Sequence, residues 1–307
     1  MKDEKHIPVL LKEVTDLLNL QEGDIVVDGT VNRGGHAREI CKQIGKTGTL
    51  IGIDLDQDAL DEAKINLKNE KCKVILENDS FRNLDKVLEK FDIDKVDPVR
   101  GSWVPSKSKK SRASNVVDAI LLDLGFSSNQ MDDSKRGFSF QKDEPLLMTL
   151  KDKPTEKDLT AKEIVNEWEE ENIADVIYGY GEEKFSRQIA KKITELRKEK
   201  PIETTQDLVA IIEKAVPNWY KHRKIHFATK TFQALRITVN DEVRALKEVL
   251  PKAIEKLSAK GRLVVISFHS IEDRIVKNFF KEQKEKELGK IITKRPITPS
   301  RKEVKSN

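Results

Sequence analysis

The chain has 307 residues, of which 36% are charged and 37% are hydrophobic, with a net charge of +4. This length suits one large domain or two ordinary ones with an ample core. No apolar run approaches the roughly 20 residues of a membrane span, and the first ten residues have no signal-peptide core, so we expect a cytoplasmic protein without a membrane partner. Cys41 and Cys72 have no CxxC spacing, so we expect reduced packing residues and no metal.

The first part of the chain alternates strand and helix patterns, which is typical of a doubly wound α/β domain with a parallel sheet. After a short helix within 6–20, the predicted strands are 25–28, 49–54, 73–76 and 116–123. The predicted helices between and after them are 37–44, 59–67 and 84–91. Strand 116–123, VVDAILLD, is the most apolar and therefore fits the centre of the sheet.

A helical block interrupts this alternation after Phe140. Helical spacing occurs at 159–168, 173–178, 184–199 and 205–216. The α/β pattern then resumes with a helix at 241–257, a strand at 262–267 and a helix at 271–280. We therefore predict a helical domain inserted into the α/β domain, with a first α/β part at 1–138, the inserted domain at 139–228, a second α/β part at 229–285 and a basic tail at 286–307.

Two segments carry mostly positive charge. Between 99 and 115 the chain has five lysine and arginine residues and no acid, within a stretch that we interpret as a loop insertion at 97–115. From 290 onward the basic residues of the tail stand against the single acid Glu303. Such patches bind phosphate backbones in some proteins and are solvated surface in others, and charge alone does not decide between these two roles.

The stretch 26–36, VVDGTVNRGGH, has the pattern of a strand, a tight turn and the start of a helix. Such a turn presents backbone N–H groups and a helix N-terminus to a ligand. Gly34 and Gly35 lead into the helix, and Asp54 ends the next strand, where a carboxylate commonly accepts hydrogen bonds from ribose hydroxyls. NAD and S-adenosylmethionine both bind in this way.

Two features of this stretch favour S-adenosylmethionine. The turn has no GxGxxG spacing, because Val31 and Asn32 stand where a pyrophosphate loop prefers glycine. Asp28 ends the first strand, and its carboxylate would repel a pyrophosphate but suit an ammonium and a sulfonium. An NAD-dependent oxidoreductase stays open as an alternative, and it would need a general acid or base beside a nicotinamide.

Two further residues follow predicted strands and therefore belong at the same edge of the sheet. Phe81 comes after the third strand, where it is either a wall for an adenine ring or a core residue. Asp123 ends the central strand, and ligands of open parallel sheets bind beyond the carboxyl ends of the strands. Its carboxylate is suited to orient an exocyclic amine and to stabilise the charge that develops as nitrogen attacks a methyl carbon. A sulfonium is already activated, so this chemistry requires no metal.

Five long words carry a family resemblance. They are GTVNRGGH (29–36), DLGFSSNQMDDSKRGFSF (123–140), YGEEKFSRQIA (180–190), HFATKTFQALRITVN (226–240) and GRLVVISFHSIEDRIVKNFF (261–280). With these words the chain resembles the MraW/RsmH family, bacterial methyltransferases that methylate N4 of a cytidine in small-subunit (16S) ribosomal RNA. The resemblance implies a class I, Rossmann-like S-adenosylmethionine-dependent methyltransferase sheet with an inserted all-helical substrate-binding domain.

The resemblance also implies roles for single residues. Cofactor contacts fall on Gly34, Gly35, His36, Asp54, Phe81, Asp123 and Gln130, with Asp123 also the candidate catalytic residue. Candidates for contact with the RNA are cationic or hydrogen-bonding side chains of the later words, namely Arg136, His226, Lys230, Arg236 and His269. Each basic residue of this second set, taken alone, is more commonly part of a surface ion pair.

The sequence departs from the family pattern at several points. Leu147 and Thr149 replace an aspartate and an arginine, and Phe227 replaces a proline. The 97–115 loop is longer than usual, and the family's arginine-rich tail is short. These departures motivate an alternative function, an RNA-binding or ribosome-assembly protein with a degenerate methyltransferase fold. The sequence leaves open whether the protein is a monomer or a homodimer.

Overall fold

The computed structural model describes residues 8–91, 117–125, 135–151, 154–155, 158–300 and 303. Two expectations lie outside these residues: the basic loop at 97–115 and the cofactor contact of Gln130. The chain divides into two compact units. The first is formed by residues 1–125 and 245–307, and the second by residues 126–244.

The first unit contains a five-stranded parallel sheet with the strand order β3-β2-β1-β4-β5. Its strands are β1 (Ile25–Asp28), β2 (Thr49–Asp54), β3 (Lys73–Asn78), β4 (Val117–Asp123) and β5 (Leu257–Ile266). Successive side chains of a strand point to opposite faces, so Val26 packs in the core on one face and Val27 in the core on the other. The doubly wound sheet predicted from the sequence is therefore confirmed, and the apolar β4 occupies an inner position.

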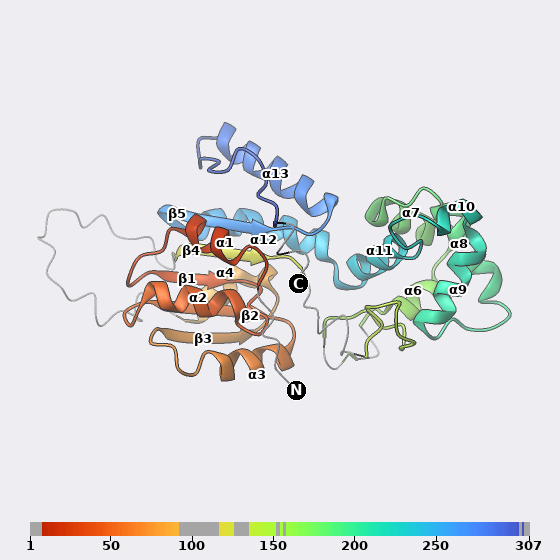
Figure 1. Cartoon of the computed structure of the whole chain (residues 1–307), viewed down its shortest axis with the longest axis horizontal. Coiled ribbons are helices and arrows are strands. Elements are labelled where there is room, and N and C mark those ends of the chain that lie inside the picture. Colours follow the sequence, from red (N-terminus) through yellow and green to blue (C-terminus); the bar gives the residue numbers. More distant parts are fainter. Residues whose placement is uncertain are drawn as a thin grey trace, which may run out of the picture. The chain divides into compact units, whose positions relative to one another are not determined.

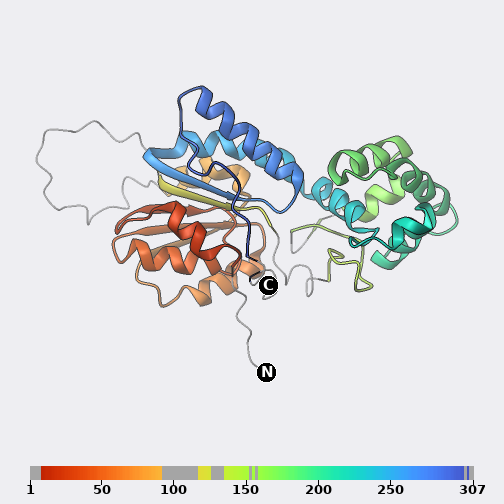
Figure 2. The same cartoon turned by 45° about the horizontal axis from the view of Figure 1, so that its top comes forward.

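Helices cover both faces of this sheet, as Figures 1 and 2 show. The helices α1 (Leu11–Leu18), α2 (Gly35–Ile44) and α3 (Gln57–Asn66) supply residues to one core. The helices α4 (Leu84–Lys90), α12 (Glu242–Lys256) and α13 (Ser270–Glu285) supply residues to the other. A short 3-10 helix, η1 (Phe81–Asn83), precedes α4. The fully buried aliphatic side chains of β1, β2 and β4 lie between these layers and fix the carboxyl ends of the strands at one edge.

Within its described residues the second unit has helices and irregular segments, and its only β-pairing is one isolated bridge between Pro145 and Thr204. Its helices are α6 (Ala161–Glu167), α7 (Glu170–Gly181), α8 (Ser186–Leu196), α9 (Thr205–Ala215), α10 (Asn218–Lys221) and α11 (Thr229–Asn240). The start of α9 is a capping box, in which the Thr204 side chain accepts from the Asp207 N–H and the Asp207 carboxylate accepts from the Thr204 N–H. The predicted helical insertion is thus present.

The boundaries of the insertion differ from those read off the sequence. The compact helical unit spans 126–244, whereas the sequence predicted 139–228. The reason is α11, which was assigned to the second α/β part. It buries Phe232 and Leu235 in the same core as the α7 residues Ile173 and Ile177, so it belongs to the helical unit. The residues before Phe140 are included because Phe138 also packs in that core.

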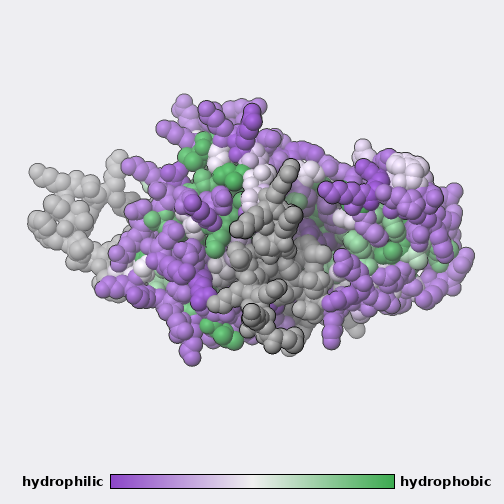
Figure 3. All heavy atoms as spheres, viewed as in Figure 1, coloured by the Kyte–Doolittle hydropathy of each residue, from purple (hydrophilic) through white to green (hydrophobic). Residues whose placement is uncertain are grey.

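The surface of the described residues is mostly hydrophilic on the face seen in Figure 3, as the composition predicts. Among the described helices, none is both long and apolar enough to cross a membrane. The last strand is longer than expected, since β5 begins at Leu257 and not at Arg262. Its pairing with β4 has an irregular register between Val117 and Ala119.

Candidate active site at the carboxyl edge of the sheet

Three aspartates end three neighbouring strands at the carboxyl edge of the sheet. Asp28 ends β1, Asp54 ends β2 and Asp123 ends β4. In the order β2-β1-β4 these strands are adjacent and parallel, so their last residues meet at one edge. The structure therefore brings together the three carboxylates that the sequence placed at this edge.

Backbone hydrogen bonds fix the loop after β1 to the strands on both sides. The Gly29 N–H donates to the Leu121 carbonyl of β4 (2.9 Å), and the Val31 N–H donates to the Ile53 carbonyl of β2 (3.0 Å). The Asp123 N–H donates to the Thr30 hydroxyl oxygen (2.7 Å). The loop is thus held at both neighbours, which makes its exposed backbone a rigid surface for a ligand.

Glycine is required at the end of this loop. Gly34 is the N-cap of α2 and has φ +84°, a left-handed conformation that other L-residues rarely adopt. A Cβ on Gly35 would lie 2.4 Å from Pro8 Cγ, so the N-terminal segment packs directly on the start of α2. The two glycines predicted to contact the cofactor thus shape the turn that places the α2 N-terminus.

Asp54 is tied to the loop from the neighbouring strand. Its Oδ2 accepts from the Asn32 N–H (2.8 Å), and its Oδ1 accepts from the Asp56 N–H (3.0 Å). Burial raises its pKa to about 6, and the backbone hydrogen bonds oppose this rise. A carboxylate has about four acceptor positions, so each oxygen retains capacity for a ribose hydroxyl. The buried Asn32 Oδ1 has no hydrogen-bond partner, which marks a second acceptor at the same place.

The carboxyl group of Asp28 is in an environment that disfavours its charged form. Its residue is 1% exposed, and burial raises its pKa from the ordinary 3.8 to about 8, despite a hydrogen bond from the Thr30 N–H (3.2 Å). At neutral pH this carboxyl group is therefore mostly protonated. The sequence argument that its negative charge would select against a pyrophosphate is not supported by this environment.

His36 lies in the first turn of α2 and links two parts of the site. The residue is 6% exposed, with Nε2 3.0 Å from the Val9 carbonyl oxygen and Nδ1 3.6 Å from Asp123 Oδ2. Because a carbonyl oxygen only accepts, Nε2 carries the proton in that contact. His36 is thus fixed to the N-terminal segment through Val9 and lies beside Asp123, and residue patterning alone gave no reason to expect this proximity.

The carboxyl group of Asp123 is the most distinctive chemical group at this edge. Its Oδ1 is buried and has no hydrogen-bond partner among the residues that the structure describes. Its pKa is raised to about 7. Burial is the main cause, the nearby Glu272 adds to the rise, and a hydrogen bond from the Gly125 backbone opposes it. A carboxyl group with a pKa near neutrality and one unused oxygen suits a proton acceptor.

Phe81 packs as a core residue, one of the two roles that the sequence left open. The ring is half-buried and packs against the core that includes Leu84 and Val87. It also lies beside the loop, since a Cβ added to Gly29 would be 3.4 Å from Phe81 Cβ. Phe81 is therefore a partly exposed core residue next to the loop, and its contact with an adenine ring stays a prediction.

The five residues predicted to meet RNA are distributed over the two units. His269 is in the first unit, where it is the N-cap of α13 and its Nδ1 accepts from the Glu272 N–H (3.4 Å). The other four are in the second unit. Arg136 donates to the Leu150 carbonyl (2.9 Å), and Lys230 donates to the Glu182 carbonyl (2.6 Å). Both cations therefore have structural contacts that the sequence did not indicate.

His226 keeps an exposed position on the second unit. Its ring stacks on Phe140 with centroids 4.5 Å apart and lies against Phe227 at 4.2 Å. Burial lowers the pKa of His226, and Glu213 opposes this change weakly. The phenylalanine at 227, where the family has proline, thus supplies a second ring for the imidazole.

Arg236 is the clearest case of a structural role. Its Nε and Nη2 donate to the two carboxylate oxygens of Glu242, both at 2.9 Å, and the two side chains are 13% and 18% exposed. We expect Arg236→Ala to lower the free energy of unfolding by about 1–3 kcal/mol, because a charge-assisted bidentate pair is lost and a carboxylate is left behind. Urea denaturation measures this change, with Arg236→Lys as the control that keeps the charge. Unchanged stability together with weaker RNA binding would instead support the RNA role.

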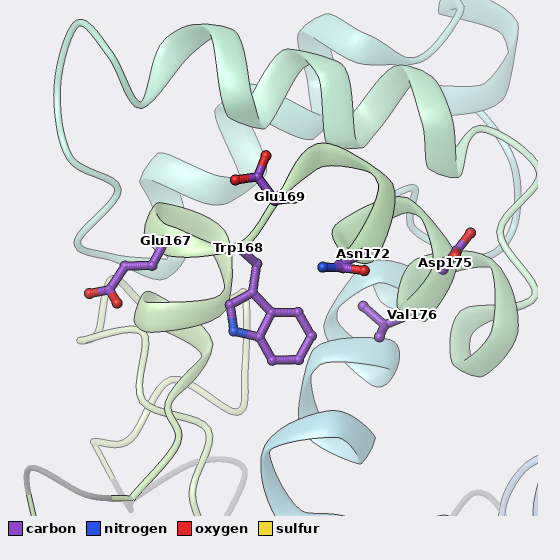
Figure 4. A pocket seen from close by; sticks show the side chains of 6 residues that line it. All are labelled: Glu167, Trp168, Glu169, Asn172, Asp175 and Val176. Atoms are coloured by element: carbon purple, nitrogen blue, oxygen red, sulfur yellow. The ribbon is translucent and has the colours of Figure 1, made fainter.

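One hollow in the second unit contains none of the predicted site residues. It is an open depression at the N-terminal end of α7, shown in Figure 4. Its lining residues are Glu167, Trp168, Glu169, Asn172, Asp175 and Val176. The three carboxylates make this depression unsuitable for a nucleic-acid phosphate.

Comparison with known proteins gives the family. A model of the MraW methylase family matches residues 3–307. The ribosomal RNA small subunit methyltransferase H of Clostridium botulinum (strain Kyoto / Type A2) is 44% identical, over 99% of this chain and 94% of its own. The protein of that name from Sulfurihydrogenibium sp. is also 44% identical, with the same coverage. A solved SAM-dependent O-methyltransferase from Thermotoga maritima is 15% identical, with a TM-score of 0.28 over 39% of this chain and 37% of that one. The chain belongs to the MraW methylase family.

Proposed function

We propose that this chain transfers a methyl group from S-adenosylmethionine to the N4 amine of a cytidine in 16S ribosomal RNA. Membership of a methylase family and relatives named for the small-subunit RNA support the reaction and the substrate. The observation that carries the proposal is Asp123, whose buried and unpartnered Oδ1 lies at the end of β4, next to the loop after β1. An enzyme with this substrate works in the cytoplasm, where ribosomes are assembled.

The residues at the sheet edge fit S-adenosylmethionine. Asp54 would hold the ribose diol, with the unpartnered Asn32 Oδ1 as a further acceptor. Phe81 would lie against the adenine ring, and Gly34 and Gly35 would allow the ligand to approach the backbone at the α2 N-terminus. When bound, this cofactor supplies a methyl group on a sulfonium, which is already a good leaving group.

Asp123 would act on the amine that receives the methyl group. Its free oxygen accepts one N–H of the cytosine N4 amine, which orients the nitrogen towards the methyl carbon. The nitrogen forms a bond to carbon as the carbon–sulfur bond breaks, the sulfur keeps the electron pair, and N4 then loses one proton. A carboxylate whose pKa is about 7 in the free protein can take that proton. His36 Nδ1 lies 3.6 Å from Asp123 Oδ2, so a protonated imidazole would stabilise the carboxylate form of Asp123.

Two of the departures from the family pattern belong to the second unit and not to the unit that contains this edge. Leu147 and Thr149 lie in the second unit, where the Leu147 carbonyl accepts from the Ala161 N–H (3.0 Å) and the Thr149 hydroxyl oxygen accepts from the Lys151 N–H (3.2 Å). Both residues support the turn before α6. The carboxylates, the loop and the helix N-terminus of the first unit are intact, so a degenerate protein without transfer is not favoured.

The proposal predicts incorporation of tritium from methyl-labelled S-adenosylmethionine into small ribosomal subunits. Nucleoside analysis of the labelled RNA should give N4-methylated cytidine as the product. Large subunits are the matched control and should remain unlabelled. Absence of label from free RNA, precursor particles and assembled subunits alike would exclude the reaction, and calorimetry with S-adenosylmethionine would then show whether the cofactor site alone is retained.

A further inference from the structure

A long segment of the second unit carries only positive charge. Residues 214–240 contain six lysine and arginine residues and no aspartate or glutamate. The cations are Lys214, Lys221, Arg223, Lys224, Lys230 and Arg236. The segment runs from the end of α9 through α10 and α11 (Figure 1). Two cations, Lys230 and Arg236, have the contacts described above, which leaves the part around α10 as the exposed basic surface.

An aromatic side chain lies at the centre of this surface. Trp219 is 57% exposed, which is unusual for a large apolar ring. It is nevertheless fixed, because Lys184 Nζ lies 4.4 Å from its centroid and the rings of Phe185 and Tyr220 meet it edge-on at 6.1 and 5.7 Å. An exposed ring that is held in one orientation presents a ready-made face to a planar ligand.

A buried hydrogen bond fixes Tyr220, one of the two rings that contact Trp219. The Tyr220 hydroxyl donates to Glu183 Oε2 (2.5 Å), and Glu183 is fully buried. Burial, together with this carboxylate, raises the pKa of Tyr220 to about 12, so the phenol stays protonated. The second oxygen of Glu183 accepts from the Phe185 N–H (2.9 Å). Both aromatic neighbours of Trp219 are thus fixed by one carboxylate.

Cations surround this fixed ring. Arg223 and Lys224 are exposed, and Arg223 Cζ lies 5.3 Å from the Tyr220 centroid. Lys221 is partly exposed and lies 3.4 Å from Glu213, and Lys184 completes the set over Trp219. The Trp219 patch is defined here as Lys184, Trp219, Lys221, Arg223 and Lys224.

Charge on this unit is separated along α7. Residues 163–175 carry six acids and no lysine or arginine, and the acidic depression of Figure 4 lies at the N-terminal end of α7. Lys184 follows the C-terminal end of the same helix, about 18 Å away for a helix of 12 residues. A polyanion is therefore repelled from one end of α7 and attracted to the other.

We propose that the Trp219 patch binds single-stranded RNA, with one base stacked on Trp219 and adjacent phosphates held by Lys221, Arg223 and Lys224. This inference rests on the proposed function, since it assigns a contact surface for the RNA substrate. A fixed ring among cations matches single-stranded nucleic acid, because every unpaired base has a face to stack and a phosphate beside it. A duplex keeps its bases stacked internally and leaves the ring without a partner.

Fluorescence anisotropy with a labelled single-stranded RNA of about 12 nucleotides tests the patch on the full chain. We expect Trp219→Ala to weaken binding by about 5- to 150-fold, the range for loss of one base–aromatic stack, and Trp219→Phe to retain most of the affinity. The double variant Arg223→Ala/Lys224→Ala should reduce the slope of log affinity against log salt by about 1.4, or 0.7 for each phosphate contact. The matched duplex should bind more weakly and should not respond to Trp219→Ala.

The control is Tyr178→Ala, which removes a ring that is 67% exposed on the acid-rich α7. It should leave RNA binding unchanged. Three results would each overturn the inference. The first is an equal loss of RNA affinity in Tyr178→Ala and Trp219→Ala, and the second is no loss of RNA affinity in Trp219→Ala. The third is binding of phosphatidylglycerol vesicles without binding of RNA. A methyl-transfer assay distinguishes failure of the Trp219 patch from failure of the proposed function. Trp219→Ala should raise KM for small subunits at unchanged kcat, whereas wild-type transfer with no effect of the variant on RNA affinity or KM would refute only the patch.

Discussion

Replacing Asp123 by alanine is expected to reduce methyl transfer by about 10²- to 10⁴-fold, the range for loss of a positioned proton acceptor. The physical reason is the buried Oδ1 at the end of β4, which has no hydrogen-bond partner within the described part of the chain and is therefore available to the amine. Single-turnover transfer from labelled S-adenosylmethionine measures the effect. Calorimetry on the same variant tells whether cofactor binding is retained, so that loss of chemistry is distinguished from loss of the site.

Asp123→Asn separates orientation from proton transfer. Asparagine keeps an oxygen that can accept an N–H, but it cannot take a proton. In the wild type, kcat/KM should rise with pH through about 7 as the Asp123 carboxyl ionises, and this limb should disappear in Asp123→Asn. Full activity of Asp123→Asn at neutral pH would show that Asp123 only orients the amine. Full activity of Asp123→Ala would remove this residue from the mechanism.

Replacing Asp28 by asparagine is expected to stabilise the first unit above pH 4 and to flatten its pH dependence. The pKa of Asp28 is about 8 in the folded protein against an ordinary 3.8, so folding takes up a proton between these values. Stability from this group is therefore fully present below pH 4 and is lost as the pH rises through 8. At pH 7 the cost to the folded state is on the order of a few kcal/mol. Asparagine has no charge to bury and keeps an acceptor for the Thr30 N–H.

Calorimetric unfolding from pH 4 to 8 measures this difference, and Asp85→Asn is the control within the same unit. Although burial raises the pKa of Asp85, hydrogen bonds from the Lys252 side chain and the Lys86 backbone outweigh it and lower the pKa overall. The contribution of Asp85 is therefore present throughout pH 4 to 8 and is lost only below its ordinary pKa, so Asp85→Asn should leave the shape of the pH profile over this range unchanged. Identical pH profiles for wild type and Asp28→Asn would show that Asp28 is ionised in the folded protein.

The sequence was sufficient to predict the architecture because each strand has its own apolar pattern. Strand 116–123 reads as buried on both faces, and β4 is buried on both faces. It was also sufficient to place Asp54 and Asp123, because a residue that ends a parallel strand belongs to the ligand edge whatever its side-chain partners are. What such a pattern cannot give is the environment of a side chain, and Asp28 shows this. Its position was predicted correctly, but its burial depends on packing from several elements.

Contacts between distant residues explain the other differences. His36 meets Asp123 across 87 positions of the chain, and Arg236 meets Glu242 around the end of a helix. A lone histidine or arginine in a sequence carries no signal for such partners, so His36 rested on family resemblance and Arg236 was assigned to RNA. The assignment of α11 to the α/β domain had the same origin, because the periodicity of a helix shows that one face is buried but not which core it joins.

The place of the helical insertion has a consequence for synthesis on the ribosome. The strands β4 and β5 pair along the sheet, yet residues 126–244 separate them in the chain. The strands β1 to β4 emerge first, so β4 has an open edge of unpaired backbone groups and apolar side chains until β5 is made. The insertion is contiguous and has its own core, so it can fold before β5 is made. A folded insertion brings its two ends closer together, which lowers the entropy cost of pairing β5 with β4. Slow folding of the insertion would prolong the lifetime of that edge, and aggregation of nascent chains would then begin at β4.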